Sequence, residues 1–294
     1  MGIDDRVGDT PVPGRGTGGG LDAGVTSGDD SPAIADVQPP EAADRTARNV
    51  RYHEKVQAEF RLAEAYALWD DGKPKFEQQW ADHVQGWPAC GEKEVAPLSE
   101  EACDAVRRGC SEFRETEEKI TTPAMLRVES ADPQRHLVGL EHRLKGEDRI
   151  MEKAARQMES QPDLTPAEAV ALIKDAIRYT FQYSEDHYTE GVDTDIKRFK
   201  LAGFELVELR NSWGNEEYKG INSRWRVPEN GQIFEVQFHT NISFEAKQLT
   251  HPAYERLRNP STSKAERDEL EGFKRSVNTY VPIPQDALIY PDYP

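Results

Sequence analysis

The segment from Tyr218 to Thr240 constrains the fold most, because its alternation predicts two strands joined by a tight turn. Apolar and polar residues alternate on both sides of Pro228-Glu229-Asn230-Gly231, and Asn-Gly favours the positive φ angles of a hairpin turn. One face of this hairpin is predicted to be apolar, with Trp225, Val227, Phe234, Val236 and Phe238. The opposite face is predicted to carry Asn222, Arg224, Arg226, Glu235, Gln237 and His239. Such a polar row is either an ordinary solvated face or a binding site.

The length of the turn decides which residues face one another across the hairpin. A two-residue loop at Asn230-Gly231 would pair Arg226 with Glu235, whereas a four-residue loop from Pro228 would pair Arg224 with Glu235. Both loops keep the two faces intact, while a three-residue loop would invert every side chain of one strand. The sequence leaves the first two registers open.

Charge and composition limit the partners of this chain. Its 294 residues include 54 acidic and 37 basic ones, which gives a formal net charge of -17. A surface of this sign repels DNA, so any anionic ligand requires a local cluster of cations. No run of about 18 apolar residues predicts a membrane span, and Met1–Gly14 lacks the basic start and apolar stretch of a standard signal peptide. We therefore expect neither DNA nor a membrane as a partner.

The composition changes along the chain and predicts four segments. Residues 1–43 are rich in Gly, Pro, Asp and Ser and are predicted to be a disordered tail or linker. A helical region is expected over 44–130, the domain with the strands over 131–285, and a terminal extension over 286–294. The predicted fold class is α/β of the α+β type, with a mixed, mainly antiparallel sheet of about five strands flanked by helices.

The helical region contains two apolar stripes at helical spacing. They consist of Val56, Phe60, Ala63 and Ala67, and of Phe76, Trp80, Val84 and Trp87. Gly72-Lys73-Pro74 is predicted to break the helix between them, and Ser99 to begin another. The stripes are interpreted as a helical layer of the fold, with a lid or a partner surface as the alternative.

The cysteines do not have the spacing of a zinc site. Cys90, Cys103 and Cys110 lack a Cys-x-x-Cys pair. We predict buried free thiols, and a single disulfide is the alternative if the protein is exported.

A basic helix is predicted between Gly139 and Met158. Its cations are spaced four, four and three residues apart and so share one helix face: Lys145, Arg149, Lys153 and Arg156. This face is either a solvated surface or a site for a polyphosphate.

A second candidate lies where a predicted strand over 177–182 follows a helix that runs from Thr165 to about Asp175. Asp175 and Arg178 stand at the entrance of this strand. A carboxylate beside a cation suits Mg²⁺ and a phosphate, and it equally suits an ordinary salt bridge.

The other predicted elements surround the hairpin. A helix over 186–202 and a strand over 204–210 precede it, and a final helix is expected over 264–280. The helix that follows Thr240 is expected to place Glu245 and Lys247 near the polar sheet face.

Taken in this order, the motifs between residues 137 and 258 resemble the synthetase domain of RelA/SpoT-type alarmone enzymes, and especially its short toxin-like relatives. The family's Arg-x-Lys motif with its following Lys is matched by Arg143, Lys145 and Lys153. Its Asp-to-Arg strand is matched by Asp175 and Arg178. Its Glu-x-Gln-x-Arg-Thr strand is matched by Glu235, Gln237, His239 and Thr240. This chain departs from the family in three places: Arg149 stands where Ser is usual, His239 replaces Arg, and the Asp175 to Arg178 gap is two residues shorter.

The resemblance implies an activity and a set of roles. Enzymes of this family transfer the β,γ-pyrophosphoryl group of ATP to a ribose 3′-hydroxyl, usually of GDP or GTP. By resemblance, Arg143, Lys145, Arg149, Lys153 and Arg178 would bind ATP. Asp175 and Glu235 would hold Mg²⁺, and Glu235 or Gln237 would orient the attacking hydroxyl. The acceptor would lie against Tyr218, Asn222 and His239.

The acceptor is the least determined part of this prediction. The family commonly has a Tyr that stacks on guanine directly after the Gly of the acceptor loop, whereas Gly220 is followed here by Ile221. Tyr218 and Trp213 are the candidates to replace that ring. A guanine nucleotide, an adenine nucleotide and the 3′ end of tRNA therefore all stay open as acceptors.

The resemblance also implies a biological context. The toxin-like relatives predict a growth-inhibiting toxin or effector that acts in the cytoplasm, with export by a route without a standard signal peptide left open. An antitoxin or immunity protein is then an expected partner. The alternative of a different class is a catalytically inactive module that binds a nucleotide or a partner protein.

Overall fold

The computed structural model describes residues 40–86 and 98–294. It divides into two units, Met1–Tyr52 and His53–Pro294. The described part of the first unit is the start of helix α1 (Pro40–Gly86), and the second unit contains every feature discussed below. Predictions for residues 1–39, for Trp87 and for Cys90 lie outside the described residues.

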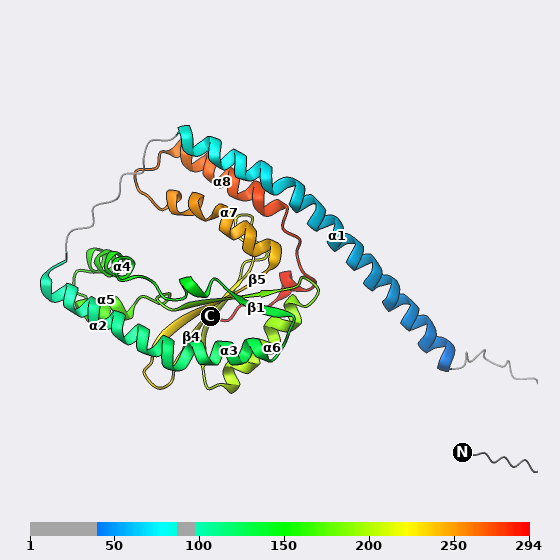
Figure 1. The fold of residues 1–294 in the computed structure, drawn as a ribbon, viewed down its shortest axis with the longest axis horizontal. Helices are drawn as coiled ribbons and strands as arrows, with labels where there is room; N and C mark the ends of the chain where they lie inside the picture. The colour runs from blue at the N-terminus through cyan, green and yellow to red at the C-terminus, as the bar shows by residue number, and fades with distance from the viewer. Residues whose placement is uncertain (1–39, 87–97) are drawn as a thin grey trace, which may run out of the picture. The chain divides into compact units, whose positions relative to one another are not determined.

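A five-stranded sheet forms the centre of the second unit, as Figure 1 shows. Its strands are β1 (Arg135–Val138), β2 (Arg178–Tyr183), β3 (Glu205–Asn211), β4 (Ile221–Arg226) and β5 (Ile233–Thr240). They lie in the order β1-β2-β5-β4-β3, and only the pairing of β2 with β5 is parallel within this sheet. The predicted mixed, mainly antiparallel sheet flanked by helices is confirmed.

The hairpin adopts the longer of the two predicted turns. Arg224 faces Glu235 across β4 and β5, and the Val227 amide donates to the Gln232 carbonyl at 2.8 Å. Gly231 supplies the positive φ of 74° that the turn requires. This register excludes the pairing of Arg226 with Glu235, because Arg226 faces Ile233.

The apolar face of the hairpin is the core of the unit. All five predicted side chains are fully buried: Trp225, Val227, Phe234, Val236 and Phe238. Helix α6 (Tyr188–Leu201) packs on this face, with the Phe199 ring 5.1 Å from Trp225 and 6.3 Å from Phe238. Burial of each such side chain contributes roughly 1.5–3 kcal/mol, so the alternation fixes which face looks inward.

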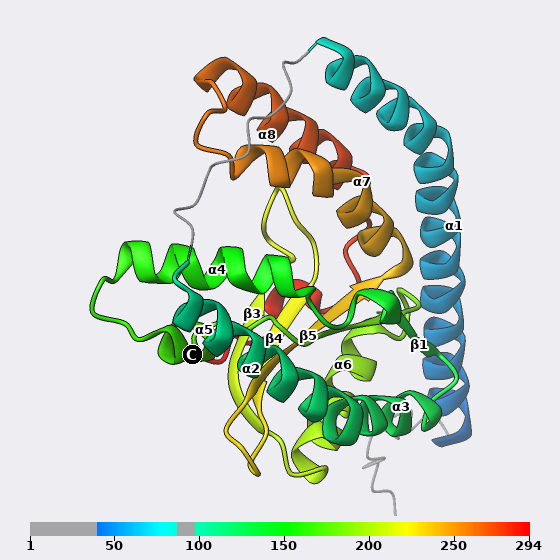
Figure 2. The same cartoon turned by 60° about the vertical axis from the view of Figure 1, so that its left-hand side comes forward.

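The opposite, polar face is bordered by helices α4 (Glu147–Ser160) and α7 (Asn241–Leu257), as Figure 2 shows. Helix α7 follows β5 directly, because the Thr240 side chain caps its first turn by accepting from the Ser243 amide. Helix α8 (Lys264–Thr279) packs against α7. The polar face is therefore enclosed between two helices rather than left as a flat solvated surface.

The remaining helices are α2 (Glu100–Thr116), a π-helical turn (Glu117–Thr121), α3 (Thr122–Ser130), α5 (Pro166–Ala171), and the short 3-10 turns Leu140–His142 and Ala287–Ile289. Ser99 caps α2 as predicted, since its Oγ accepts from the Ala102 amide at 3.2 Å. Cys103 and Cys110 on α2 are free thiols, and Cys110 is buried. None of the helices in the described ranges is long and apolar enough to cross a bilayer.

Two predicted helix boundaries were wrong near the candidate site. The basic helix begins at Glu147 rather than near Gly139, because Leu144 pairs with Ile177 as an extended bridge. The Lys145 amide donates to the Ala176 carbonyl at 2.9 Å within this bridge. Helix α5 ends at Ala171, short of Asp175. At the start of the basic helix, pairing with the start of β2 overrides helix propensity.

The predicted break in the first helix was also wrong, because α1 continues through Pro74 (Figure 2). Trp69 and Phe76, on either side of the proline, are both buried. The Trp69 indole donates to Glu245 at 2.9 Å, and the Phe76 ring lies 6.4 Å from Phe273 of α8. Contacts on both sides of the proline offset the hydrogen bond that it removes.

The two predicted apolar stripes on α1 have different fates. Trp80 packs on Phe273 at 5.7 Å, which agrees with a helical layer. The stripe that contains Phe60 is exposed instead, and the Phe60 side chain is 68% accessible. The buried Phe76 belongs to the second predicted stripe, whereas Val84 of that stripe is exposed and the buried Trp69 belongs to neither stripe.

A buried ion cluster that the sequence did not predict joins β1 to α6. The Arg135 guanidinium is fully buried, with Nε 2.9 Å from Asp195 and Nη1 3.2 Å from Asp132. The Tyr183 hydroxyl donates to Asp195 at 2.7 Å. Burial raises the pKa of the Asp195 carboxyl, while Tyr183, Arg135 and Arg198 oppose that rise. The cluster therefore depends on all its charges being present.

We predict that Arg135→Met lowers the free energy of unfolding by about 3–5 kcal/mol, because it leaves Asp195 buried with one cation fewer. Chemical denaturation followed by circular dichroism measures this change. The matched control is Lys197→Met, which removes the exposed Lys197–Asp193 pair from α6, the helix that carries Asp195. It is expected to change the free energy of unfolding little. Equal destabilisation by the two variants would contradict the prediction.

Candidate functional site

The polar face of the sheet brings predicted site residues together in rows across three strands. Arg178 on β2 faces Glu235 on β5, and Glu235 faces Arg224 on β4. In the next row, Gln237 lies between Thr180 and Asn222. Residues that pair directly across strands point to the same face, so β5 carries its two polar side chains at the centre of the site.

A cluster of two lysines and one carboxylate adjoins this row. The Lys153 amine contacts both oxygens of Asp175, at 2.6 and 2.7 Å, and the Lys145 amine lies 3.3 Å from the same carboxylate. Burial alone would raise the pKa of Asp175, but the two lysines hold it below its usual value. Burial lowers the pKa of Lys145, and the nearby charges of Arg178 and Lys153 lower it further, against the attraction of Asp175.

The bridge between the segment before α4 and β2 explains this convergence. The Arg178 amide donates to the Arg143 carbonyl at 2.7 Å, which aligns residues 143–145 with the start of β2. Lys145 reaches Asp175 from this extended segment, whereas Lys153 reaches it from the first half of α4. Lys145, Lys153 and Asp175 therefore meet, although Lys145 does not belong to the helix.

The central carboxylate of the site is held by a chain of hydrogen bonds that ends in a lysine. The Lys247 amine donates to Gln237 Oε1 at 2.5 Å, and Gln237 Nε2 donates to Glu235 Oε1 at 2.5 Å. Burial, together with the charge of Arg178, lowers the pKa of Lys247 to about 7, against the opposing effect of Glu235. The sequence placed Lys247 near this face but assigned it no role.

The three residues predicted for the acceptor contact one another. The Tyr218 hydroxyl donates to Asn222 Oδ1 at 2.8 Å and lies 3.0 Å from His239 Nε2. Ser243 Oγ lies 2.9 Å from His239 Nδ1 on the other side of the ring. Burial lowers the pKa of His239 far below its usual value, so the ring is neutral. His239 thus supports Tyr218 rather than providing a charge.

Of the two aromatic residues that could stack on the acceptor base, Trp213 and Tyr218, the structure leaves only Tyr218 accessible. Trp213 is fully buried and packs edge-on against Tyr188 at 5.0 Å, so its faces are not available to a purine. Tyr218 is only half-buried. Gly220 has a φ of 150°, and a Cβ there would lie 2.8 Å from His239 Cε1, which explains the glycine at this turn.

Three other cations of the basic segment lie differently from the prediction. Arg143 Nε contacts Glu117 at 2.6 Å, so this guanidinium is anchored to the π-helical turn. Arg149 and Arg156 both pair with Glu152 on α4 itself. The shared basic face is therefore only partly realised, because acidic neighbours on the same helix hold two of its four cations.

Arg149 nevertheless contributes charge near the site. Burial lowers the pKa of His251 on α7, and the charges of Arg178, Lys247 and Arg149 lower it further, with Glu255 opposing. Cations from β2, α4 and α7 therefore act on one region between the two helices. Such a concentration of charge favours a polyanionic ligand.

The two predicted metal carboxylates, Asp175 and Glu235, do not belong to a closed metal site. No group of three or more His, Cys, Asp or Glu side chains is arranged to hold a metal within residues 40–86 and 98–294. Mg²⁺ typically binds one or two carboxylates and completes its shell with water and substrate phosphates. In this structure both oxygens of Asp175 contact Lys153, and Glu235 accepts a hydrogen bond from Gln237.

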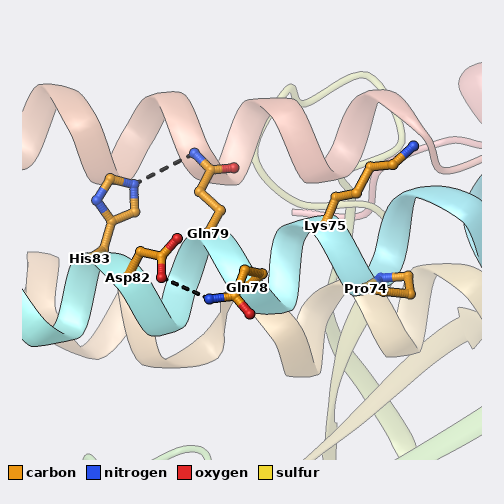
Figure 3. A pocket seen from close by; sticks show the side chains of 6 residues that line it. All are labelled: Pro74, Lys75, Gln78, Gln79, Asp82 and His83. Atoms are coloured by element: carbon orange, nitrogen blue, oxygen red, sulfur yellow. Dashed lines mark hydrogen bonds between the residues drawn. The ribbon is translucent and has the colours of Figure 1, made fainter.

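Two hollows of the described surface lie away from this chemistry. A hollow of about 560 Å³ runs along α1 (Figure 3) and is lined by Pro74, Lys75, Gln78, Gln79, Asp82 and His83. Its side chains contact one another along the helix, as Gln78 does with Asp82 at 2.7 Å. A second hollow of about 310 Å³ lies between α2, α5 and the hairpin turn. Neither includes a predicted site residue, so charge and convergence locate the candidate site.

Comparison with known proteins gives matches among solved structures. No family model and no curated protein matches this chain. Small alarmone synthetase 1 from Bacillus subtilis is 12% identical, with 60% of this chain and 92% of that chain covered and a TM-score of 0.41. In the complex of the type VI effector Tas1 with its immunity protein, the matched chain is 16% identical, with 60% of this chain and 96% of that chain covered and a TM-score of 0.40. A GTP pyrophosphokinase family protein from Streptococcus pneumoniae is 14% identical, with 61% of this chain and 87% of that chain covered and a TM-score of 0.37. Small alarmone synthetases, the class that the motifs between residues 137 and 258 resemble, are thus among the solved structures to which this chain is similar.

Proposed function

We propose that this chain is a Mg²⁺-dependent ATP:nucleotide 3′-pyrophosphokinase. The observation that carries the proposal is the convergence of Lys145, Lys153 and Asp175 beside the row that contains Arg178 and Glu235. Pyrophosphoryl transfer requires positioning and charge neutralisation more than covalent chemistry from the protein. Cations, metal-binding carboxylates and an oriented hydroxyl on one sheet face meet that requirement.

The donor triphosphate is assigned to the cations between α4 and α7. Lys145 and Lys153 share the carboxylate of Asp175, and their amines can exchange it for phosphate oxygens. Arg178 and Lys247 add charge from the sheet and from α7. Mg²⁺, bound by Asp175 and Glu235 together with substrate phosphates, would supply further neutralisation of the polyphosphate.

The acceptor is assigned to the side of the sheet that carries Tyr218 and Asn222. Its 3′-hydroxyl oxygen attacks the β-phosphorus of ATP, the bond from that phosphorus to the α,β-bridging oxygen breaks, and AMP leaves. Glu235 orients the hydroxyl and accepts its proton, and Gln237 fixes the Glu235 carboxylate through the 2.5 Å hydrogen bond. Tyr218 is the aromatic residue that we assign to the acceptor base.

We predict that Glu235→Gln lowers the rate of AMP release by about 10²- to 10³-fold, because it removes a charge that acts on the reacting groups. The measurement is mass spectrometry of the products after incubation with ATP, Mg²⁺ and GDP, GTP, ADP or tRNA. The same products identify the acceptor.

The matched control for this prediction is Glu205→Gln. Glu205 lies on β3, pairs with the exposed Arg226 at 3.2 Å, and has no assigned role in the reaction. This variant should keep the wild-type rate. Full turnover by a folded Glu235→Gln protein would contradict the assignment of Glu235.

We predict that nucleotide binding takes up a proton at pH 8, because Lys247 has a pKa of about 7 in the free protein and a phosphate beside it raises that pKa. Affinity should then fall as the pH rises above 7, where the free protein has lost this charge. Calorimetry in buffers of different ionisation enthalpy measures the proton uptake.

The Lys247→Met variant tests the source of that proton. It should bind ATP without the uptake, whereas Lys197→Met, which changes an exposed lysine on α6, should bind like the wild type. Lys145 also has a lowered pKa, so undiminished uptake in Lys247→Met would assign the proton elsewhere and contradict the prediction.

From the resemblance to the toxin-like relatives, we further propose that the product arrests growth and that an antitoxin or immunity protein accompanies the enzyme. Induced expression of the wild-type chain in a bacterial host should slow growth and deplete ATP, whereas Glu235→Gln should do neither at equal protein level. Growth arrest by the inactive variant would contradict a toxic role for the product.

A further inference from the structure

The loop between β3 and β4 is folded on itself by several hydrogen bonds. The Ser212 amide donates to the Gly220 carbonyl at 2.9 Å, and the Lys219 amine donates to the Trp213 carbonyl at 2.9 Å. The Glu217 amide donates to Asn215 Oδ1 at 2.7 Å. Residues 212–220 therefore form a compact loop, and this loop carries Tyr218 into the candidate site.

Helix α8 holds this loop from outside through one carboxylate. Lys274 contacts Glu217 Oε2 at 2.7 Å, and Arg275 contacts Glu217 Oε1 at 3.2 Å. Asn278, one turn further along α8, donates from Nδ2 to the Glu217 carbonyl at 3.0 Å. Three side chains of α8 thus bind one loop residue, and that residue is next to Tyr218 in the chain.

The Lys274 side of the contact is more enclosed than an ordinary surface ion pair. Only 11% of the Lys274 side chain is accessible, and Asn278 is buried. The Lys274 amine also lies 5.6 Å from the centre of the Tyr254 ring, so an aromatic face and a carboxylate share it. Charge-assisted hydrogen bonds in such surroundings are stronger than exposed pairs.

The other end of the same loop is fixed at the site itself. The Tyr218 hydroxyl lies between Asn222 Oδ1, at 2.8 Å, and His239 Nε2, at 3.0 Å. Consecutive residues of the loop therefore face two anchors: Glu217 faces α8, and Tyr218 faces the sheet. A displacement of Glu217 from α8 would be passed to Tyr218 through a single peptide unit.

We propose that Glu217 is a positioning residue for the acceptor side of the site, and that Lys274, Arg275 and Asn278 of α8 act through it to set the place of Tyr218. The inference rests on the proposed function in one respect, because Tyr218 is assigned there to the acceptor. Donor binding does not involve this contact, since the assigned donor cations lie on β2, α4, α7 and the segment before α4. We call the contacts of Glu217 with Lys274, Arg275 and Asn278 the clamp. The clamp therefore acts on acceptor binding and not on donor binding.

The test compares Glu217→Gln with Glu271→Gln. Glu271 is a matched control, because it contacts the same Arg275 at 3.7 Å but does not belong to the loop. In Glu217→Gln we expect the KM for the nucleotide acceptor to rise about tenfold through loss of charge-assisted hydrogen bonds, while the KM for ATP stays within about twofold. Glu271→Gln should leave both KM values at the wild-type level.

A double-mutant cycle shows whether the effect passes through Tyr218. In a Tyr218→Ala background, Glu217→Gln should raise the acceptor KM by less than about twofold more, because the ring that Glu217 positions is already absent. Independent, multiplicative effects of the two substitutions would overturn the inference. An equal rise in the KM values for ATP and acceptor would also overturn it.

Hydrogen exchange tests the clamp without reference to the reaction. Amides of residues 212–220 should exchange about tenfold faster in Glu217→Gln than in Glu271→Gln, while those of β5 should be unchanged. Unchanged exchange in the loop would overturn the clamp. If the wild-type protein forms no product with any nucleotide tested, the proposed function fails, and the exchange measurement still decides whether Glu217 holds the loop.

Discussion

The parallel pairing of β2 with β5 is the constraint on which the candidate site depends. The Glu235 amide donates to the Ile177 carbonyl at 2.9 Å, and this register sets Arg178 opposite Glu235. Asp175 lies three residues before Arg178, so the Lys145–Lys153–Asp175 cluster lies just before the strand whose first residue faces Glu235. The segment before α4 bonds to the start of β2 and adds Lys145. A shift of one residue between these strands would send Glu235 to the apolar face and dismantle the site.

Electrostatics at the site run against the charge of the whole chain. The sequence carries a net charge of -17, yet cations from β2, α4, α7 and the segment before α4 face one region. Burial lowers the pKa values of Lys145 and Lys247, the repulsion from neighbouring cations lowers them further, and the carboxylates of Asp175 and Glu235 oppose both effects. A region where positive groups are held close and partly desolvated is prepared for a polyanion, because the ligand relieves the repulsion when it binds. The acidic remainder of the surface confines that attraction to one place.

The sequence predicted the parts of this structure that follow from local periodicity. The alternation of the hairpin identified Trp225 and Phe238 as core and Glu235 and Gln237 as the polar row, because a half-buried strand has a fixed period of two. Periodicity failed where a long-range contact decides the outcome. The bridge of Leu144 to Ile177 shortened the basic helix, and the contacts of Trp69 and Phe76 carried α1 through Pro74. Strand β1 and the buried Arg135–Asp195 pair had no local signal, since a four-residue strand and an ion pair 60 positions apart are recognisable only after folding. The role of Lys247 was missed for the same reason, because its hydrogen bond to Gln237 depends on the angle at which α7 leaves β5.

The uninterrupted course of α1 has a consequence for where the working unit begins. Trp69 and Lys73 both bind Glu245 of α7, at 2.9 and 2.7 Å, two residues before the lysine that reaches Gln237. Helix α1 therefore supports α7, the helix that carries Lys247. A protein that began after residue 98 would keep every strand of the sheet and all its motifs. It would lack the contacts of Trp69 and Lys73 with Glu245, and Lys247 would therefore be held less firmly.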